Sequence, residues 1–185
     1  MPKEVHAELE RKMKATIDDL QRDLSGLRTG RATPALLERI TVDYYGAQTP
    51  LQQLAMISVA EARQLLVKPH DKSVAGQIAN TISKSDLGVQ AVREGDAIRV
   101  SIPSMNEERR KEMVRMAAKK TEDHKIAMRN VRRDANDHLK RMEKDGGMTK
   151  DDLKREEDAV QKVTDKFIAE ADKLRVAKEA EILEV

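Results

Sequence analysis

The chain has 185 residues, of which 39% are hydrophobic and 37% are charged, a balance that suits long helices with narrow apolar stripes better than one thick globular core. Its 35 basic and 33 acidic residues nearly cancel, so any basic binding site must come from clustering and not from net charge. The lack of cysteine excludes disulfides, thiolate metal sites and cysteine nucleophiles, and an aromatic content of 2% is low for a protein that stacks single-stranded bases.

The sequence gives no sign of a membrane or export segment. No apolar stretch approaches the roughly 20 residues that a membrane-spanning helix needs. The charged opening, MPKEVHAELERK, lacks the apolar core of a signal peptide and the acid-poor composition of a transit peptide. We therefore expect a soluble cytoplasmic protein that does not act at a membrane.

The first segment predicts a helix with a single apolar stripe, because its apolar residues recur at spacings of three and four. We expect this helix to end at Thr29-Gly30, since glycine readily adopts the left-handed conformation common at helix ends. The stripe consists of Val5, Leu9, Met13, Ile17, Leu20, Leu24 and Leu27.

The following 70 or so residues show short apolar runs separated by turn residues, which is typical of strands. A helical spacing also occurs, over residues 73–83. We therefore predict a small α+β domain over residues 31–103. Its strands are expected at residues 40–45, 54–59, 64–68 and 97–103.

A second long helix is predicted after Pro103, with Asn106 as its N-cap and Gly146-Gly147 at its end. Its seam alternates strictly between steps of three and four, which is a seven-residue repeat. At 1.5 Å per residue the helix would be about 60 Å long. The seam residues are Val114, Ala117, Thr121, His124, Met128, Val131, Ala135, His138 and Met142.

A third helix is predicted to begin at Thr149, a good N-cap that is followed by two acidic residues in the first turn. It would run almost to the C-terminus over about 50 Å. Its seam consists of Leu153, Val160, Val163, Phe167, Ala171, Leu174 and Ile182.

Each of these helices carries one narrow stripe that it cannot bury alone. We therefore predict the α+β class, with an elongated three-helix bundle made of residues 1–30 and 104–185 and the small α+β domain inserted between them. Two chain crossings join the domains, and because interfaces of this kind are commonly weak we expect a hinge there. The alternative is a pair of ordinary loops with a fixed interface. The hinge residues would be Thr29, Gly30, Pro103, Ser104 and Met105.

Positive charge is concentrated in RNVRRDAND, residues 129–137 of the second helix. Arg129, Arg132 and Arg133 share one helical face, and Lys125 and Lys140 would extend it into a basic ridge. In one interpretation the face is simply solvated and Arg133 pairs with the acid at position 137, one turn on. In the other, the guanidinium groups bind phosphates of folded RNA, a mode that needs few aromatic side chains.

The residues give no indication of catalysis, a cofactor or a metal site. His124 and His138 lie on the seam about 21 Å apart along the helix axis, too far to share an ion, and His6 and His70 add no ligand spacing. The GQIANTISKSDLG segment lacks the spacing of a phosphate-binding loop, and MTKDDLKREED lacks that of a calcium loop. We expect a protein that is not an enzyme.

Four separated blocks closely resemble the bacterial ribosome recycling factor family. They are LRTGRATPALL (27–37), YYGAQTPLQQLA (44–55), NEERRKEM (106–113) and RNVRRDAND (129–137). The order of the predicted elements is also similar, so that the resemblance covers essentially the whole chain.

The resemblance implies a long three-helix domain and a smaller inserted domain, joined by a hinge into an L shape. It also implies a monomer that binds between the ribosomal subunits after termination and splits them with elongation factor G and GTP hydrolysis, as the factor moves the small domain about Gly30 and Ser104. The long domain would contact large-subunit ribosomal RNA, first through Arg132. The other contacts implied by the matching motifs are Arg129, Arg110, Arg28, Arg31 and Arg133.

Other functions stay open at this point. The heptad seams would also suit a coiled-coil interaction module with no role in RNA binding. An organellar relative or an inhibitory paralogue of the recycling factor would share the same blocks.

Overall fold

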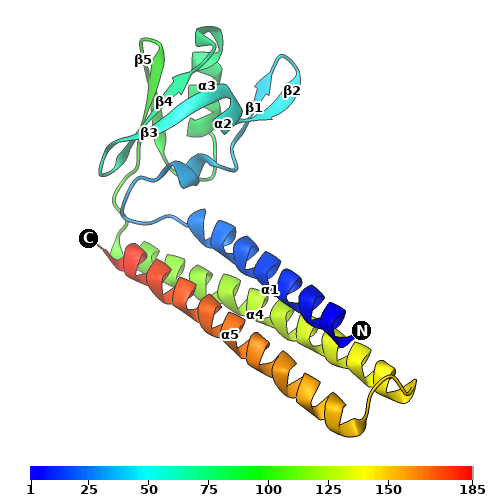
Figure 1. The fold of residues 1–185 in the computed structure, drawn as a ribbon. Helices are drawn as coiled ribbons and strands as arrows, with labels where there is room; N and C mark the ends of the chain where they lie inside the picture. Colours follow the sequence, from blue (N-terminus) through cyan, green and yellow to red (C-terminus); the bar gives the residue numbers. More distant parts are fainter. Residues whose placement is uncertain (185) are drawn as a thin grey trace. The chain divides into compact units, whose positions relative to one another are not determined.

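The chain forms two compact units in the computed structural model, which describes residues 1–184. The first unit contains Met1–Leu24 and Arg115–Glu179, and the second contains Ser25–Val114 and the C-terminal residues from Ala180. The predicted class is confirmed, because long helices form a bundle and a small unit contains the strands (Figure 1). The domain boundaries after residues 30 and 103 stay a prediction.

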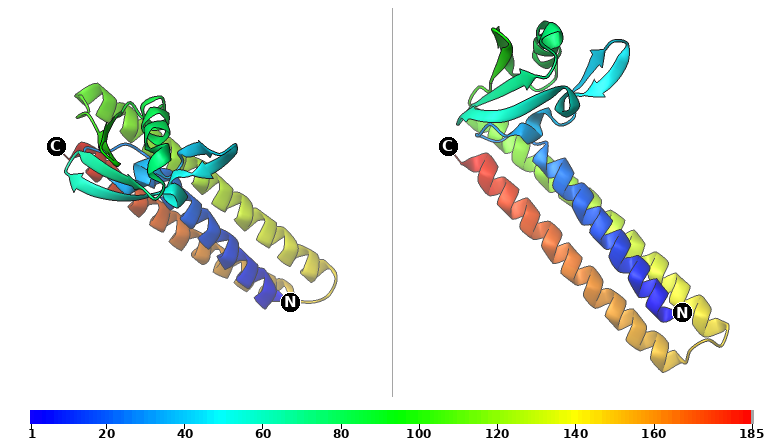
Figure 2. Two further views of the ribbon diagram at one scale, coloured as in Figure 1. Left: turned by 90° about the horizontal axis from the view of Figure 1, so that it is seen from above. Right: turned by 45° about the horizontal axis from the view of Figure 1, so that its top comes forward.

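The first unit consists of the greater part of three helices: α1 (Pro2–Ser25), α4 (Glu107–Lys144) and α5 (Lys150–Leu183). They lie side by side along their length in Figure 1 and in both views of Figure 2. All the predicted stripe residues of α1 are buried. A helix of α4's 38 residues is about 57 Å long.

α1 ends earlier than predicted, at Ser25 instead of Thr29-Gly30. The residue that follows is Gly26, which has a low helix propensity because its backbone loses the most freedom on ordering. Leu27 is still buried beyond the helix end. The apolar spacing at this position therefore indicates burial and not a continuation of the helix.

The α4 seam is also partly different from the strict heptad prediction. His138 is exposed, whereas its neighbour Leu139 is fully buried. A straight helix has 3.6 residues per turn, so its buried side drifts away from a strict 3.5-residue repeat. Two buried positions on the long helices are threonines, Thr121 on α4 and Thr164 on α5, and each hydroxyl donates to the carbonyl four residues earlier at 2.8 Å.

Two glycines form the turn that connects α4 to α5. Gly146 has φ +78°, a conformation that side chains rarely adopt. The Gly146 N–H donates to the Glu143 carbonyl at 3.0 Å, and the Gly147 N–H donates to the Met142 carbonyl at 2.9 Å. This is a Schellman motif, which satisfies carbonyls at the end of α4.

Both predicted N-caps are confirmed. The Asn106 side chain accepts from the Arg109 N–H at 2.7 Å. Thr149 Oγ1 accepts from the Asp152 N–H at 3.1 Å, and the Asp152 carboxylate accepts from the Thr149 N–H at 3.3 Å. The reciprocal pair is a capping box and fixes the start of α5.

The second unit contains two antiparallel sheets. β1 (Thr41–Tyr44) pairs with β2 (Ala47–Pro50), and a four-stranded sheet has the order β3-β4-β6-β5. The strands of the larger sheet are β3 (Ala55–Glu61), β4 (Gln64–Pro69), β5 (Gln90–Glu94) and β6 (Ala97–Ser101). The predicted strands correspond to β1, β3, β4 and β6, while β2 and β5 were missed.

The helical elements of this unit are short. They are η1 (Pro34–Leu37), α2 (Leu51–Leu54), η2 (Lys72–Val74) and α3 (Ala75–Ser83), of which only α3 was predicted. Ile78 and Ile82 of α3 are fully buried in one core with residues of β4 and β6 such as Leu65 and Ile98. The core therefore lies between α3 and the larger sheet.

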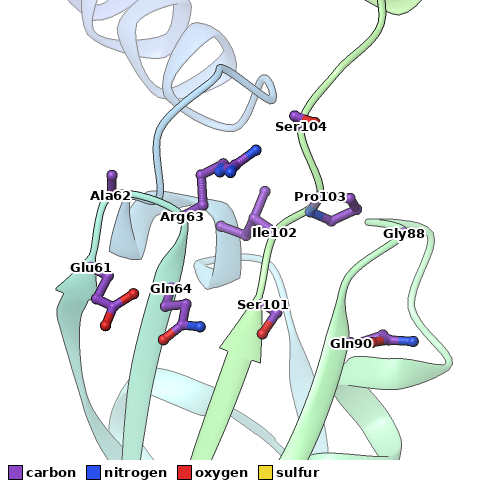
Figure 3. Close-up of a pocket in the computed structure, with 10 residues that line it drawn as sticks. All are labelled: Glu61, Ala62, Arg63, Gln64, Gly88, Gln90, Ser101, Ile102, Pro103 and Ser104. Carbon is purple, nitrogen blue, oxygen red and sulfur yellow. The ribbon is translucent and has the colours of Figure 1, made fainter. Parts of the chain in front are cut away.

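A hollow of about 770 Å³ opens at one end of the larger sheet. Figure 3 shows the β3–β4 turn on one of its sides and the end of β6 on another. Its lining mixes polar and apolar groups from Glu61–Gln64, Gly88, Gln90 and Ser101–Ser104. Nothing in this lining concentrates charge of one sign.

Candidate RNA-binding site

The arginines of the basic ridge lie near the middle of α4. Met128 is fully buried and Ala135 is buried, which turns this seam towards the other helices. Arg129 and Arg132 are partly buried beside the seam and Arg133 is exposed. The helical spacing therefore directs the three guanidinium groups to the flank of the bundle, as predicted.

The partners of these arginines differ in charge. Arg129 Nη1 donates to the Glu122 carboxylate at 3.1 Å. Arg132 Nη1 donates to the Gln161 amide oxygen at 3.3 Å, and Arg133 Nη1 donates to the Asn130 amide oxygen at 3.1 Å. Within residues 1–184, Arg132 and Arg133 have no carboxylate at ion-pair distance, so neither positive charge is neutralised by an ion pair.

The predicted pair of Arg133 with Asp137 is wrong. Arg133 contacts Asn130, three residues towards the N-terminus of α4. Helical side chains lean towards the helix N-terminus, which brings Arg133 near the preceding turn and away from the following one. The interpretation of the ridge as a solvated face, neutralised by acids of its own helix, therefore loses the ion pair on which it mainly rested.

The two lysines do not extend the ridge as expected. Lys125 Nζ lies 3.1 Å from Asp172 of α5, and Lys140 Nζ lies 3.7 Å from Glu157 of α5. Both charges are offset by acids of the neighbouring helix. The unneutralised part of the ridge is therefore Arg132 and Arg133.

The remaining predicted arginines belong to the second unit. Arg31 Nη2 pairs with the Glu184 carboxylate at 2.6 Å. Arg110 Nη1 donates to the Met105 carbonyl at 3.3 Å, and Arg28 Nη2 donates to the Pro103 carbonyl. Arg110 and Arg28 thus bond to neutral oxygens, like Arg132 and Arg133 in the first unit.

Arg28 differs from the other predicted arginines in the burial of one of its nitrogens. Its Nε is buried and has no hydrogen-bond partner among the described residues. Burial lowers the pKa of the Arg28 guanidinium, and the charge of nearby Arg109 lowers it further. A phosphate oxygen close to this group would offset both effects. Arg109, which sequence reasoning did not single out, is itself paired with Glu112 at 3.0 Å.

Arg28, which precedes the first predicted crossing, donates a hydrogen bond to the Pro103 carbonyl of the second crossing. Thr29 is buried, and its hydroxyl hydrogen-bonds the backbone of Arg31. A Cβ added to Gly30 would lie 2.8 Å from the Glu184 carbonyl oxygen, so that position requires glycine for close packing. In the other crossing Pro103 and Ser104 are exposed and Met105 is buried.

Histidine spacing did not reveal one cluster in the first unit. His124 contacts Asp19 and Asp23 of α1. The two aspartates are one turn apart in the sequence, but nothing in the sequence aligns them with His124.

No helix of residues 1–184 has the length and hydropathy needed to cross a bilayer.

Comparisons with known proteins agree with the resemblance of the four sequence blocks. A family model described as "Ribosome recycling factor" matches residues 20–183. A ribosome-recycling factor of Shouchella clausii is 51% identical to this chain, and one of Bacillus subtilis is 49% identical. Each match extends over 185 residues and covers 100% of both chains.

Two solved structures are also similar over the whole chain. A "solution structure of the ribosome recycling factor" has a TM-score of 0.78 at 38% identity and covers 100% of this chain and 98% of its own. The second, with a TM-score of 0.71, 43% identity and 100% coverage of both chains, comes from "models for the T. thermophilus ribosome recycling factor and the E. coli elongation factor G bound to the E. coli post-termination complex". With a matching family model and full-length relatives at about half identity, the chain belongs to the ribosome recycling factor family.

Proposed function

We propose that this protein recycles ribosomes. It binds the post-termination ribosome in the cytoplasm and, with elongation factor G and GTP, splits it into subunits, so that mRNA and tRNA are released. The observation that carries the proposal is its full-length similarity, at 43% identity, to a recycling factor described together with elongation factor G on a post-termination complex.

The RNA contacts in this proposal begin with Arg132. Arg132, Arg133, Arg110 and Arg28 bind phosphates of large-subunit ribosomal RNA in the space between the subunits. The support is that all four bond to neutral oxygens and none is paired with a carboxylate in the described chain. Such guanidinium groups gain charged hydrogen bonds on binding phosphate without giving up an ion pair.

Arg129 and Arg31 contribute differently. Each starts in an ion pair, with Glu122 and Glu184 respectively. Binding phosphate therefore means exchanging one anion for another, and the net gain is smaller than for a group without such a pair. We assign them secondary roles in affinity.

The mechanical part of the proposal is a hinge at Thr29-Gly30 and Pro103-Ser104-Met105. The three-helix domain is anchored to RNA while elongation factor G moves residues 31–103, and the anchored bundle is driven against the bridges between subunits. The support is that two single-chain crossings are the covalent links of the inserted segment. NMR relaxation tests this: distinct rotational correlation times for residues 31–103 and for the bundle are expected, and one shared correlation time would contradict the hinge.

GTP hydrolysis in this scheme belongs to elongation factor G, and the recycling factor acts as a monomer without a cofactor. A purified sample should release no phosphate from GTP on its own. GTP hydrolysis by a sample free of elongation factor G would contradict the assignment.

Light scattering of post-termination ribosomes tests the whole proposal. Scattering should fall only when this protein, elongation factor G and GTP are all present, because subunits scatter less than the intact ribosome. No fall, in ribosomes that a known recycling factor does split, would overturn the proposal. Sedimentation with the same ribosomes then distinguishes binding without splitting from no binding, which is what a coiled-coil module would show.

A further inference from the structure

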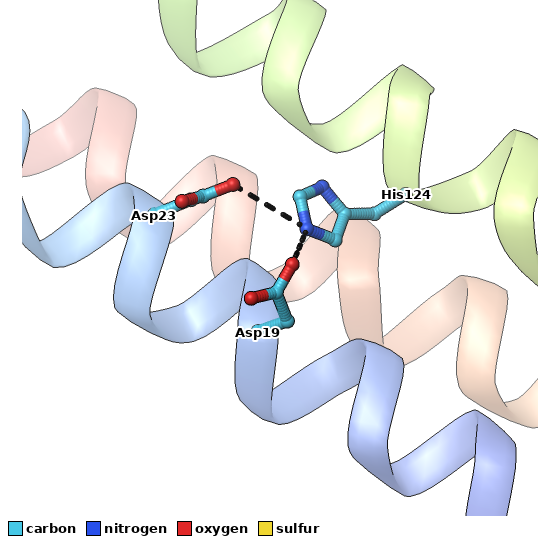
Figure 4. A group of neighbouring side chains, drawn as sticks. All are labelled: Asp19, Asp23 and His124. Carbon is cyan, nitrogen blue, oxygen red and sulfur yellow. Dashed lines mark hydrogen bonds and ion pairs between the residues drawn. The ribbon is translucent and has the colours of Figure 1, made fainter.

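Three side chains from two helices converge in the first unit. Asp19 and Asp23 lie one turn apart on the same face of α1, and His124 of α4 points between them (Figure 4). His124 Nε2 lies 2.8 Å from Asp19 Oδ2 and 3.5 Å from Asp23 Oδ2. One atom from each residue lies within 4.8 Å of the other two.

The backbone of α4 fixes the orientation of the imidazole. His124 Nδ1 lies 2.6 Å from the Lys120 carbonyl oxygen, which can only accept a hydrogen bond, so Nδ1 carries a hydrogen. Nε2 then faces two carboxylates, which are also acceptors. Nε2 of His124 and the two carboxylates therefore converge on one point, where a cation would meet one nitrogen and two oxygen ligands.

The arrangement has the chemistry of a transition-metal site. An imidazole with its second nitrogen bonded to a backbone carbonyl is the usual form of a histidine ligand. Zinc bonds to nitrogen and oxygen are about 2.0–2.2 Å long, so the ligand atoms of a tetrahedral site lie about 3.3–3.6 Å apart. The His124–Asp23 contact of 3.5 Å fits this spacing, and the His124–Asp19 contact of 2.8 Å would lengthen by about 0.5 Å on binding. The two carboxylates supply oxygen ligands and the imidazole supplies a nitrogen ligand, a mixed set of donor atoms that transition-metal ions accept.

The site is accessible and has room for further ligands. The side chain of Asp19 is 59% exposed, that of Asp23 is 24% exposed and that of His124 is 11% exposed. A hollow of about 340 Å³ adjoins Asp19 and His124, and its other lining residues are Ala15, Thr16, Asp123 and Ala127. The small side chains leave space for water ligands, and Asp123 brings another carboxylate to the hollow.

We propose that Asp19, Asp23 and His124 bind one divalent transition-metal ion of the zinc class, which cross-links α1 to α4. The imidazole favours such an ion over Mg²⁺ or Ca²⁺, which prefer all-oxygen sites. Because no ribosome contact enters the argument, the site stands or falls independently of the recycling function.

Calorimetric titration of the chelator-treated full-length protein with Zn²⁺, slightly above neutral pH, tests the site. We expect one saturable site, a rise in melting temperature with zinc, and at least about tenfold weaker binding in His124→Gln and in Asp23→Asn. His138→Gln is the matched control, because His138 is an exposed histidine on the same helix. It should bind zinc like the unaltered protein. Circular dichroism verifies that each variant is folded.

NMR of the imidazole nitrogens gives a second readout that does not depend on the variants. On addition of zinc, the Nε2 resonance of His124 should move to the range of a metal-bound nitrogen while Nδ1 stays protonated. An Nε2 that keeps its proton at saturating zinc would overturn the proposal, since the cation between the carboxylates would then be a proton. Equal loss of zinc affinity in His124→Gln and His138→Gln, or no saturable binding, would also overturn it.

Discussion

Arg132 shows how the partner of one side chain determines its expected role. Its Nη1 on α4 donates a hydrogen bond to the neutral amide oxygen of Gln161 on α5 at 3.3 Å. Arg129 lies one turn earlier on the same face of α4, yet it is paired with the Glu122 carboxylate. Two arginines of one helical face therefore start from different electrostatic states, and we expect Arg132 to contribute more to binding an anion.

Arg132→Ala should weaken ribosome binding about 10- to 100-fold, because a hydrogen bond to a charged group contributes about 1.5–3 kcal/mol and each 1.4 kcal/mol is tenfold. The fold should be unaffected, since the protein loses a single bond to Gln161. Ribosome co-sedimentation measures the affinity and circular dichroism measures the helix content.

Arg155→Ala is the control for this change. Arg155 is an exposed arginine on α5 that pairs with Asp152, and its removal should leave ribosome affinity unchanged. Equal weakening by both variants would indicate a general effect of charge, and full affinity in Arg132→Ala would remove Arg132 from the site.

At the scale of elements, the turn between α4 and α5 depends on one backbone conformation. Gly146→Ala should lower the free energy of unfolding by about 1–2 kcal/mol, because φ +78° brings a side chain's Cβ close to the backbone. Urea denaturation measures the change. Asp145→Ala, at the exposed preceding position, should change stability by no more than about 0.5 kcal/mol. Similar losses in both variants would contradict the role of Gly146.

The capping box of α5 predicts a dependence of stability on pH. Hydrogen bonds from the Thr149 side chain and backbone, together with the charge of Arg155, lower the pKa of Asp152 below its usual 3.8, against a smaller opposing effect of burial. Because the pKa is lower in the folded state, the ionised carboxylate stabilises the folded protein. This contribution to the free energy of unfolding is present above pH 3.8 and is lost as the pH falls through the folded-state pKa.

Asp152→Asn should therefore be less stable than the unaltered protein at neutral pH, and this difference should shrink in acid. Thermal unfolding over a series of pH values measures it. A difference in stability that stays constant down to the acid limit would show that ionisation of Asp152 is not involved.

The elements that the sequence predicted are those with a buried apolar face or a capping residue. The α1 stripe, the caps at Asn106 and Thr149, and α3 all have a local signal of this kind. β2 and β5 were missed because their residues are mostly exposed and their pairing rests on backbone hydrogen bonds to β1 and β6.

The candidate site was predictable only in part, for a related reason. Helical spacing placed the arginines on one face, because that follows from α4 alone. Their partners depend on neighbouring helices, so the spacing could not show that Lys125 is paired with Asp172 and Arg132 with neutral Gln161. The cluster of Asp19, Asp23 and His124 was missed because it joins residues about 100 positions apart in the chain.

For the whole molecule, the balance of charge predicts how binding responds to salt. The net charge is only +2, so long-range attraction is weak and the salt effect should come from local phosphate contacts. Four such contacts predict a slope of about −3 for log K against log salt, or about a 60-fold loss of affinity from 50 to 200 mM. Titrations of ribosome binding at several salt concentrations measure this slope, and a slope near zero would contradict phosphate contact.

The helical unit is discontinuous in sequence, and this has a consequence for its synthesis. The apolar stripe of α1 is made first, but α4 can begin to cover it only after about 90 intervening residues have been added, and α5 follows later still. At 5–20 residues per second, that delay is about 5–20 s. During it the nascent chain exposes a row of large aliphatic side chains with no native partner. We therefore expect newly made α1 to be a binding segment for chaperones, although the finished protein buries every residue of that row.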